Sequence, residues 1–127
     1  MLLTLSLRDF VIVENLNLDF QSGFTVLTGE TGAGKSITLD AIGLLLGDKA
    51  DYSQVRHGAK EAQLSALFDI SHLSFLKEEL HDQGLLDDGE EELSIRRIID
   101  AKGKSRSFIN NQAVTLAQLK SVGSQLI

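Results

Sequence analysis

The sequence FTVLTGETGAGKSITLDAIGLLLG fills positions 24–47 and contains three patterns in succession. Phe24–Thr28 is short, β-prone and mostly apolar, which predicts a strand buried inside a sheet. Gly29–Ser36 is rich in glycine. From Gly34 to Leu46 the apolar residues recur at helical spacing, and Gly47 is placed to end that helix. A buried strand, a glycine-rich loop and a helix therefore follow one another directly.

The glycine-rich loop matches the pattern G-x-x-x-x-G-K-[ST] at every fixed position. Its glycines allow backbone conformations in which successive N–H groups point at phosphate oxygens. Gly34 opens a helix whose unpaired N–H groups and positive dipole end attract an anion. Lys35 can place an ammonium on the β- and γ-phosphates, and the Ser36 hydroxyl can bind Mg²⁺. The candidate site residues are Gly29, Glu30, Thr31, Gly32, Ala33, Gly34, Lys35 and Ser36.

This loop predicts that the chain binds Mg²⁺-ATP, or another nucleoside triphosphate, through the triphosphate, with Ser36 as the metal ligand. Glu30 and Thr31 occupy variable positions, where the backbone matters more than the side chain. The alternative is a strand-to-helix turn that contains Lys-Ser by chance. The buried strand before the loop and the helix after it favour the binding site, because the phosphate-binding mechanism requires that context.

Alternating and helical patterns outside this stretch predict an α/β fold. The predicted strands are Leu2–Asp9, Glu14–Phe20, Glu61–Ile70, and a hairpin of Leu93–Asp100 with Ser105–Ile109. The predicted helices are Ser74–Gln83 and a last one opened by Thr115 and Gln118, which have capping-box spacing. Asp48–Lys60 is polar and is predicted to be mainly loop. With no linker or repeat inside it, the sequence indicates a single domain spanning residues 1–127.

The run Gly29–Gly47 resembles the RecN DNA-repair proteins, which belong to the SMC-like branch of the ABC-type ATPases. Leu5–Val13 and Gly103–Asn110 also resemble that family. Ile37 points the same way, because many ABC and SMC relatives carry threonine directly after the loop serine, and RecN-type sequences often do not. The resemblance implies a P-loop NTPase half head with an antiparallel β-subdomain. Residues 1–127 would be the N-terminal lobe of an ATPase head in a longer protein acting in DNA double-strand break repair and recombination.

Two further motifs of that family have no match in this sequence. A Walker B segment needs an apolar run followed by Asp-Glu, but Asp69 is followed by Ile70 and Asp100 by Ala101. The Leu-Ser-Gly-Gly signature is also missing. In the family both lie far downstream, beyond a coiled coil, so no complete catalytic set is expected here. The resemblance implies three partners: the C-terminal half of the same head, a second head, and DNA for the full-length protein.

Two other functions stay open from the sequence. The chain could be the P-loop half of another ABC-type ATPase, such as a RecF-like repair protein or a transporter subunit. It could also be a non-catalytic module that binds nucleotide without turnover. Residues downstream of Ile127 would separate the three functions. A glutamine-bearing loop followed by heptad repeats, the signature and Walker B would favour the RecN-like ATPase, and a short helical insert would favour another ABC-type ATPase. Loss of the heptads with no Walker B would favour the non-catalytic module.

The net charge of −6 argues against a surface that binds nucleic acid throughout, but the charge is uneven. A basic cluster follows an acidic stretch and comprises Arg96, Arg97, Lys102, Lys104 and Arg106. It could contact DNA phosphates, although a solvated hairpin face is the simpler interpretation. Arg8 could similarly reach the nucleotide, or be an exposed strand arginine. The acidic stretch Asp87–Glu92 and the three histidines are predicted to bind no metal.

The sequence predicts a cytoplasmic protein that does not span a membrane. Its longest leucine run, Leu44–Leu46, is far too short to cross a bilayer. The N-terminus alternates apolar and polar residues and carries no secretory signal pattern. For the full-length protein, the resemblance adds association with the nucleoid.

Overall fold

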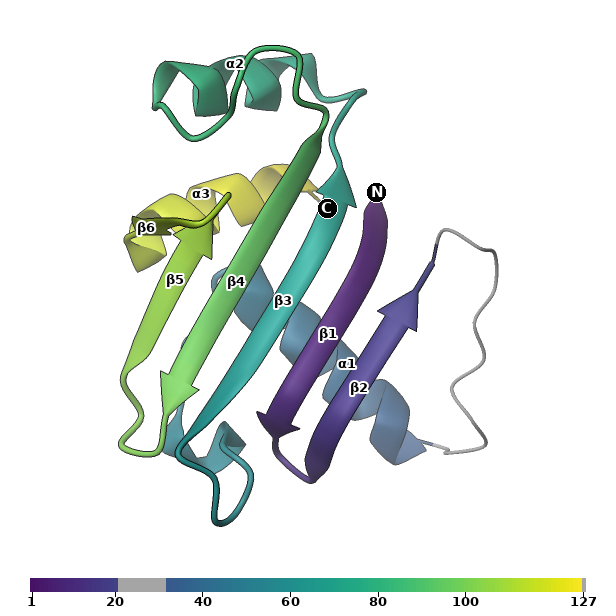
Figure 1. Cartoon of the computed structure of the whole chain (residues 1–127), viewed down its shortest axis with the longest axis vertical. Helices are drawn as coiled ribbons and strands as arrows, with labels where there is room; N and C mark the ends of the chain where they lie inside the picture. Colours follow the sequence, from purple (N-terminus) through teal and green to yellow (C-terminus); the bar gives the residue numbers. More distant parts are fainter. Residues whose placement is uncertain (21–31, 127) are drawn as a thin grey trace.

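The computed structural model describes residues 1–20 and 32–126 and shows one twisted antiparallel sheet with helices against it (Figure 1). The sheet order is β2-β1-β3-β4-β5-β6. The strands are β1 Leu2–Phe10, β2 Val13–Asp19, β3 Glu61–Asp69, β4 Glu92–Asp100, β5 Ser105–Ile109 and β6 Gln112–Val114. The helices are α1 Gly32–Leu45, α2 Ser74–Asp82 and α3 Leu116–Leu126, with a short 3₁₀ turn η1 at Tyr52–Gln54.

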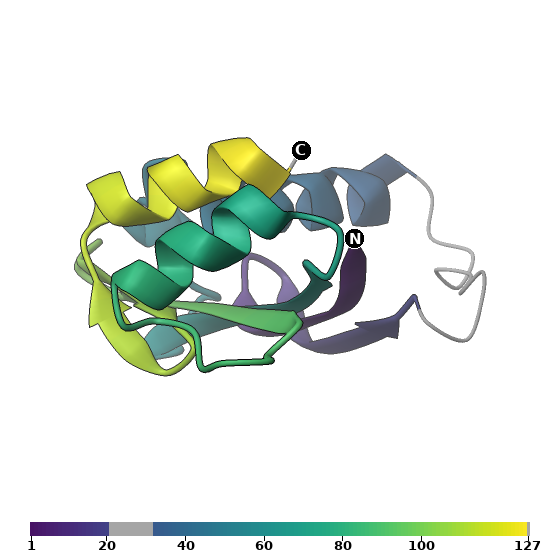
Figure 2. The same ribbon diagram turned by 90° about the horizontal axis from the view of Figure 1, so that it is seen from above.

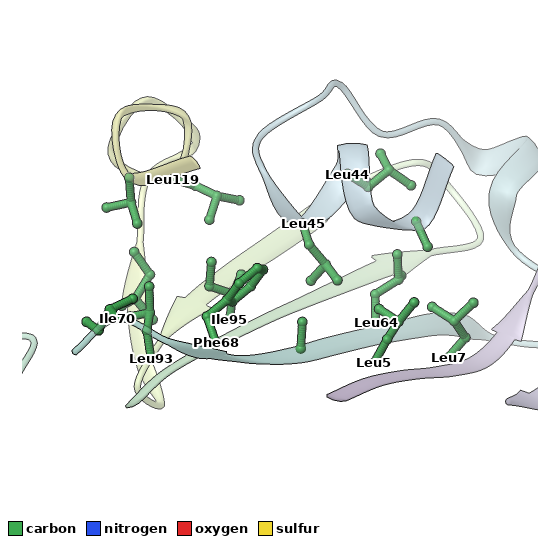
Figure 3. Packing of buried hydrophobic residues seen from close by; sticks show 14 of the residues in the cluster. Leu5, Leu7, Leu44, Leu45, Leu64, Phe68, Ile70, Leu93, Ile95 and Leu119 are labelled. Carbon is green, nitrogen blue, oxygen red and sulfur yellow. The ribbon is translucent and has the colours of Figure 1, made fainter. Parts of the chain in front are cut away.

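All three α-helices lie on one face of the sheet, and its other face is bare in the described part of the chain (Figure 2). Side chains alternate between these faces along each strand. On the helix face Leu5 pairs with Ala66, which pairs with Ile95, and all three are buried. Leu44 and Leu45 of α1 and Leu119 of α3 pack onto this apolar surface (Figure 3). Hydrophobic burial between helices and sheet therefore sets the orientation of every strand.

The predicted strands and helices within the described residues are confirmed, with ends shifted by a residue or two. The predicted strand Phe24–Thr28 lies outside the described residues. Strand β6 is missed by the sequence patterns because it is only three residues long. Asn110 and Asn111, with φ of 49° and 66°, form the tight turn that leads into it. Such a pair at positive φ is typical of a hairpin turn, so Asn110-Asn111 was the available signal.

Helix α1 ends in a glycine stop, as the sequence predicts. Gly47 has a φ of +114°, its N–H donates to the Leu44 oxygen at 3.2 Å, and the Asp48 N–H donates to the Gly43 oxygen at 3.0 Å. These two hydrogen bonds form a Schellman motif, which satisfies carbonyl groups left open at the helix end.

Helix α3 begins with the predicted capping box. The Thr115 N–H donates to Gln118 Oε1 at 2.8 Å, and the Gln118 N–H donates to Thr115 Oγ1 at 3.1 Å. The helix then runs close to the end of α1: a Cβ added at Gly123 would lie 2.3 Å from the Leu46 oxygen. None of the helices in the described part of the chain is long and apolar enough to span a membrane.

Candidate nucleotide-binding site

The glycine-rich loop runs into the N-terminus of α1. The helix begins at Gly32, two residues before the predicted start at Gly34, so Gly32, Ala33, Gly34, Lys35 and Ser36 belong to its first turns. Gly29, Glu30 and Thr31 lie outside the described residues. The first N–H groups of a helix have no partner within it, and the helix dipole makes that end positive. The described end of the motif therefore has the backbone arrangement that a phosphate group needs.

The opposite end of α1 is held by a buried arginine. Arg97 of β4 is fully buried and donates one hydrogen bond to the Leu44 main-chain oxygen at 2.8 Å and one to Ser105 Oγ at 2.8 Å. A third bond goes to the main-chain oxygen of Asp48. Burial lowers the pKa of Arg97, and the charge of Asp48 opposes that effect. A cation beside the last carbonyl groups of a helix is stabilising, so Arg97 fixes α1 to β4 and β5.

Arg97 corrects the sequence interpretation of the basic cluster, because it faces neither DNA nor solvent. Alternation along β4 puts it on the helix face between Ile95 and Ile99, which are also buried. The sequence contains the signal for this placement: Ile95, Arg97 and Ile99 are alternate residues of one strand and therefore face the same side of the sheet. The adjacent arginines had suggested a single charged patch.

The other four members of the basic cluster lie in two places, the bare face of the sheet and the turn after β4. Arg96 lies on the bare face, with its guanidinium carbon 4.5 Å from the centre of the Phe108 ring. Lys102 and Lys104 lie in the turn after β4, where their N–H groups donate to Asp100 Oδ1 at 2.8 and 3.0 Å. Arg106 is exposed on β5. Arg96 and Arg106 share the bare face, but the five residues do not form one surface, because Arg97 is buried on the helix face and the two lysines lie in the turn.

Arg8 is exposed on β1, beside Asn15 of β2 and Gln63 of β3. It alternates with the buried Leu7 and so faces away from the helices. The sheet separates it from α1. This placement favours the interpretation of Arg8 as a strand-surface residue.

Sequence reasoning missed a contact between the loop after α1 and the end of β1. The Arg56 N–H donates to the Asp9 oxygen at 2.8 Å, and its guanidinium lies 3.8 Å from Asp9 Oδ1. Phe10 and Val55 form a β-bridge beside it. The pairing joins residues far apart in sequence, and no local pattern announces it.

The acidic stretch and the histidines bring together no metal-binding set in the described ranges. His81 Nε2 lies 2.6 Å from Asp88 Oδ1 and 3.9 Å separates its Nδ1 from Asp82 Oδ1. No group of three or more His, Cys, Asp or Glu within residues 1–20 and 32–126 is arranged to hold a metal ion. Ser36 is thus the sole metal ligand predicted from the sequence.

Comparison with known proteins places this arrangement in a family. The family model described as AAA domain matches residues 4–125. The chain is 48% identical to the DNA repair protein RecN of Xylella fastidiosa over 127 residues. That match covers all of this chain and 22% of the relative, so the chain spans about a fifth of its length. The resemblance to RecN proteins inferred from the sequence is confirmed.

Solved structures show the same fold. An SMC ATPase from work on "ATP-driven dimerization and DNA stimulated activation of SMC ATPases" superposes with a TM-score of 0.73 at 24% identity. The match covers 98% of this chain and 78% of that one. The recombination mediator protein RecF, solved as "RecF-ATPrS in RecFOR pathway", superposes with a TM-score of 0.66 at 17% identity. That match covers 94% of this chain and 29% of RecF. The predicted P-loop α/β half head with an antiparallel sheet is confirmed. The chain belongs to the AAA domain family.

Proposed function

We propose that the chain is the ATP-binding half of a RecN-like ATPase acting in DNA double-strand break repair and recombination. One observation carries the proposal: the motif Gly29–Ser36 leads into α1 at Gly32, on a sheet-and-helix fold shared with SMC heads. Identity of 48% with a RecN protein favours this branch. Residues 1–127 would form the N-terminal lobe of the head.

The residues of the motif suit a nucleoside triphosphate bound with Mg²⁺. Backbone N–H groups at the start of α1 supply donors for phosphate oxygens. Lys35 would add a mobile positive charge on the β- and γ-phosphates, and Ser36 would supply a hydroxyl oxygen to Mg²⁺. When bound, Mg²⁺ neutralises charge that builds up on the phosphates during transfer. Arg97 would not touch the nucleotide. It would help to position the site because it holds the C-terminal end of the same helix.

The proposed partners are the C-terminal half of the same head, a second head, and DNA. The short span of the chain within its relatives, 22% of the Xylella protein, supports the first. Support for the other two comes from the SMC neighbour, which is described by ATP-driven dimerization and DNA-stimulated activation. A cytoplasmic location, with nucleoid association of the full-length protein, fits a DNA-repair role.

A RecF-like ATPase is the second candidate, because the RecF structure shares the fold with a TM-score of 0.66. Its identity of 17% is far below the 48% of the RecN relative, so the RecN-like function is favoured. A transporter subunit, or a module that binds nucleotide without turnover, would use the same motif.

Calorimetric titration of the chain with ATP, ADP and AMP, each with and without Mg²⁺, tests the proposal. A site that grips β- and γ-phosphates should bind ATP at least about tenfold more tightly than AMP, which is about 1.4 kcal/mol. Mg²⁺ should strengthen ATP binding but leave AMP binding unchanged. Equal affinities for ATP and AMP would refute a triphosphate site.

A further inference from the structure

The bare face of the sheet carries three arginines from strands far apart in sequence. Arg8 of β1, Arg96 of β4 and Arg106 of β5 lie on the face opposite the helices, as the strand alternation shows. We call these three residues the arginine band. None of the three makes an ion pair or a side-chain hydrogen bond with another residue of ranges 1–20 and 32–126.

The strand register places the band in two neighbouring rows across the sheet. One row runs from Arg8 through Gln63 and Ile98 to Arg106. Adjacent strands lie about 4.8 Å apart, so the ends of this row are separated by roughly 14 Å. The next row runs through Ser6 and Ser65 to Arg96 and Phe108; these positions, like those of the first row, lie directly opposite one another.

Apart from Ile98 and Phe108, the residues that accompany the arginines in the two rows have hydrogen-bonding side chains. A shallow hollow of about 240 Å³ lies beside Arg8 and is lined by Ser6, Asn15, Asn17, Gln63 and Ser65. Ser, Asn and Gln side chains, together with arginine, are groups that contact phosphate and sugar in DNA complexes. The two rows contain no carboxylate.

Acidic residues border the band at both ends of the strands. Glu61 faces Asp100 at one end, and Asp69 faces Glu92 at the other. A polyanion on this face would be repelled by both borders, so it would lie across the strands. The acidic stretch Asp87–Glu92 follows α2, and Lys77 and His81 of that helix pair with two of its carboxylates, Glu91 and Asp88.

The one aromatic residue in the two rows is covered. Arg96 lies over the Phe108 ring at 4.5 Å, and its Nε is buried and unpartnered within the described residues. Stacking thus orients the guanidinium and takes up a ring face that a nucleic acid base would need. The surface suits a charged backbone and offers little for unstacked bases.

We propose that the arginine band binds the sugar–phosphate backbone of double-stranded DNA, which lies across the strands on the bare face. The choice of DNA rests on the proposed repair function, whereas the site rests on the charges and register of the sheet. The contact reads no sequence, because it involves phosphates alone. The tip of the β4–β5 hairpin, at Lys102 and Lys104, is outside this site.

The test measures fluorescence anisotropy of a labelled short duplex, over a range of salt concentrations, with three forms of the chain. The first is wild type. The second carries Arg8→Gln, Arg96→Gln and Arg106→Gln. The third is a matched control with Lys49→Gln, Lys102→Gln and Lys104→Gln. It removes the same number of positive charges, two of them at the tip of the β4–β5 hairpin. Each lost phosphate contact should reduce the slope of log affinity against log salt by about 0.9.

The band variant should bind the duplex at least about tenfold more weakly at low salt and lose up to about 2.7 from the slope, while the control keeps most of both. The double variant Arg8→Gln, Arg106→Gln changes only exposed residues, and its slope of log affinity against log salt should fall by about 1.8. This variant keeps the test valid if Arg96→Gln unfolds the chain. An equal or larger loss in the control, an unchanged band variant, or no duplex binding by wild type would overturn the proposal.

Two further arms identify the ligand and separate this inference from the proposed function. A single strand of the same length should bind no more tightly than the duplex; clear preference for the single strand would overturn a duplex backbone site. ATP affinity of the band variant should equal that of wild type, since the sheet separates the band from α1. If the wild-type chain binds ATP normally but does not bind the duplex, the inference fails and the nucleotide site stands.

Discussion

The guanidinium of Arg97 donates a hydrogen bond of 2.8 Å to the main-chain oxygen of Leu44, a residue 53 positions away. This contact joins the central strand β4 to the last turn of helix α1, which starts inside the motif Gly29–Ser36. The same guanidinium also reaches Ser105 of β5. One buried side chain therefore connects helix α1 with the hairpin.

Replacing this arginine should destabilise the fold. Arg97→Met keeps much of the side-chain volume but leaves the oxygens of Leu44 and Asp48 without that donor inside the protein. Each buried acceptor left without a partner costs about 1–3 kcal/mol, and Arg97→Met leaves two such main-chain oxygens. Urea unfolding at neutral pH should therefore show a loss of about 3 kcal/mol in the free energy of unfolding.

Arg96→Met is the control for that experiment, since Arg96 is half-buried and faces the other side of the sheet. Arg96→Met should lower the free energy of unfolding by less than about 1 kcal/mol, which is the range of a cation–π contact. Equal losses for the two variants would contradict the role assigned to Arg97.

Gly123 provides a test of the packing between α3 and α1. Alanine favours a helix over glycine by about 1 kcal/mol, yet a Cβ at Gly123 would meet the Leu46 main-chain oxygen. Overpacking against backbone costs about 1–3 kcal/mol, so Gly123→Ala should lower stability. At Gly43 the added Cβ meets only the flexible Asp48 carboxylate. Gly43→Ala should therefore be neutral or stabilising. In thermal melts the midpoint should fall for Gly123→Ala and should stay level or rise for Gly43→Ala.

Asp100 should contribute stability that depends on pH. Partial desolvation raises the pKa of Asp100, but the N–H groups of Lys102 and Lys104, with their ammonium charges, outweigh it and lower the pKa below the ordinary 3.8. The unfolded state then binds more protons near that pH. The contribution is complete well above 3.8 and is lost as pH falls through the lower folded-state value.

The variant Asp100→Asn should consequently be less stable than wild type at neutral pH, and the difference should vanish in acid. Urea midpoints measured from neutral pH to below the ordinary pKa of 3.8 check this. Asp87→Asn, at an exposed carboxylate in the loop after α2, is the control and should show little change in midpoint at any pH. A difference that persists in acid would contradict the charge-based explanation.

The chain alone should not turn over ATP at an enzymatic rate. The proposed site would supply phosphate-binding groups and one Mg²⁺ ligand, but transition-state stabilisation needs further preorganised charges. Asp69 and Asp100 end apolar strands, yet their carboxylates accept hydrogen bonds from the N–H groups of Ser71 and of Lys102 and Lys104. Phosphate release should be far below about 1 s⁻¹ and match a Lys35→Ala control. Steady release that disappears in the control would show a catalytic carboxylate in this chain.

Local patterns predicted much of the fold. Alternation identified strands such as β3 and β4, and Gly47 and the Thr115–Gln118 pair marked helix ends because capping is decided by neighbours in sequence. Contacts between distant residues escaped prediction. The register that brings Arg8, Arg96 and Arg106 onto one face depends on strand order, which no local pattern encodes.

The candidate site was predicted from a short motif whose spacing carries its own chemistry. The structure adds the start of α1 at Gly32 and the anchor at its other end. The roles of Lys35 and Ser36 stay predictions, because they rest on the motif alone. Arg97 adjoins the surface residue Arg96 in sequence but lies on the opposite face of the sheet, so adjacency in sequence does not predict its burial.

The central claim is that Gly29–Ser36 binds a nucleoside triphosphate, and the affinity of Lys35→Ala for Mg²⁺-ATP tests it most directly. Calorimetry should compare this variant with wild type and with Lys49→Ala, an exposed lysine just after α1. Circular dichroism should show the same fold in all three. Lys35→Ala should bind ATP at least about tenfold more weakly, whereas Lys49→Ala should bind like wild type. Equal ATP affinities for wild type and Lys35→Ala would contradict the assignment.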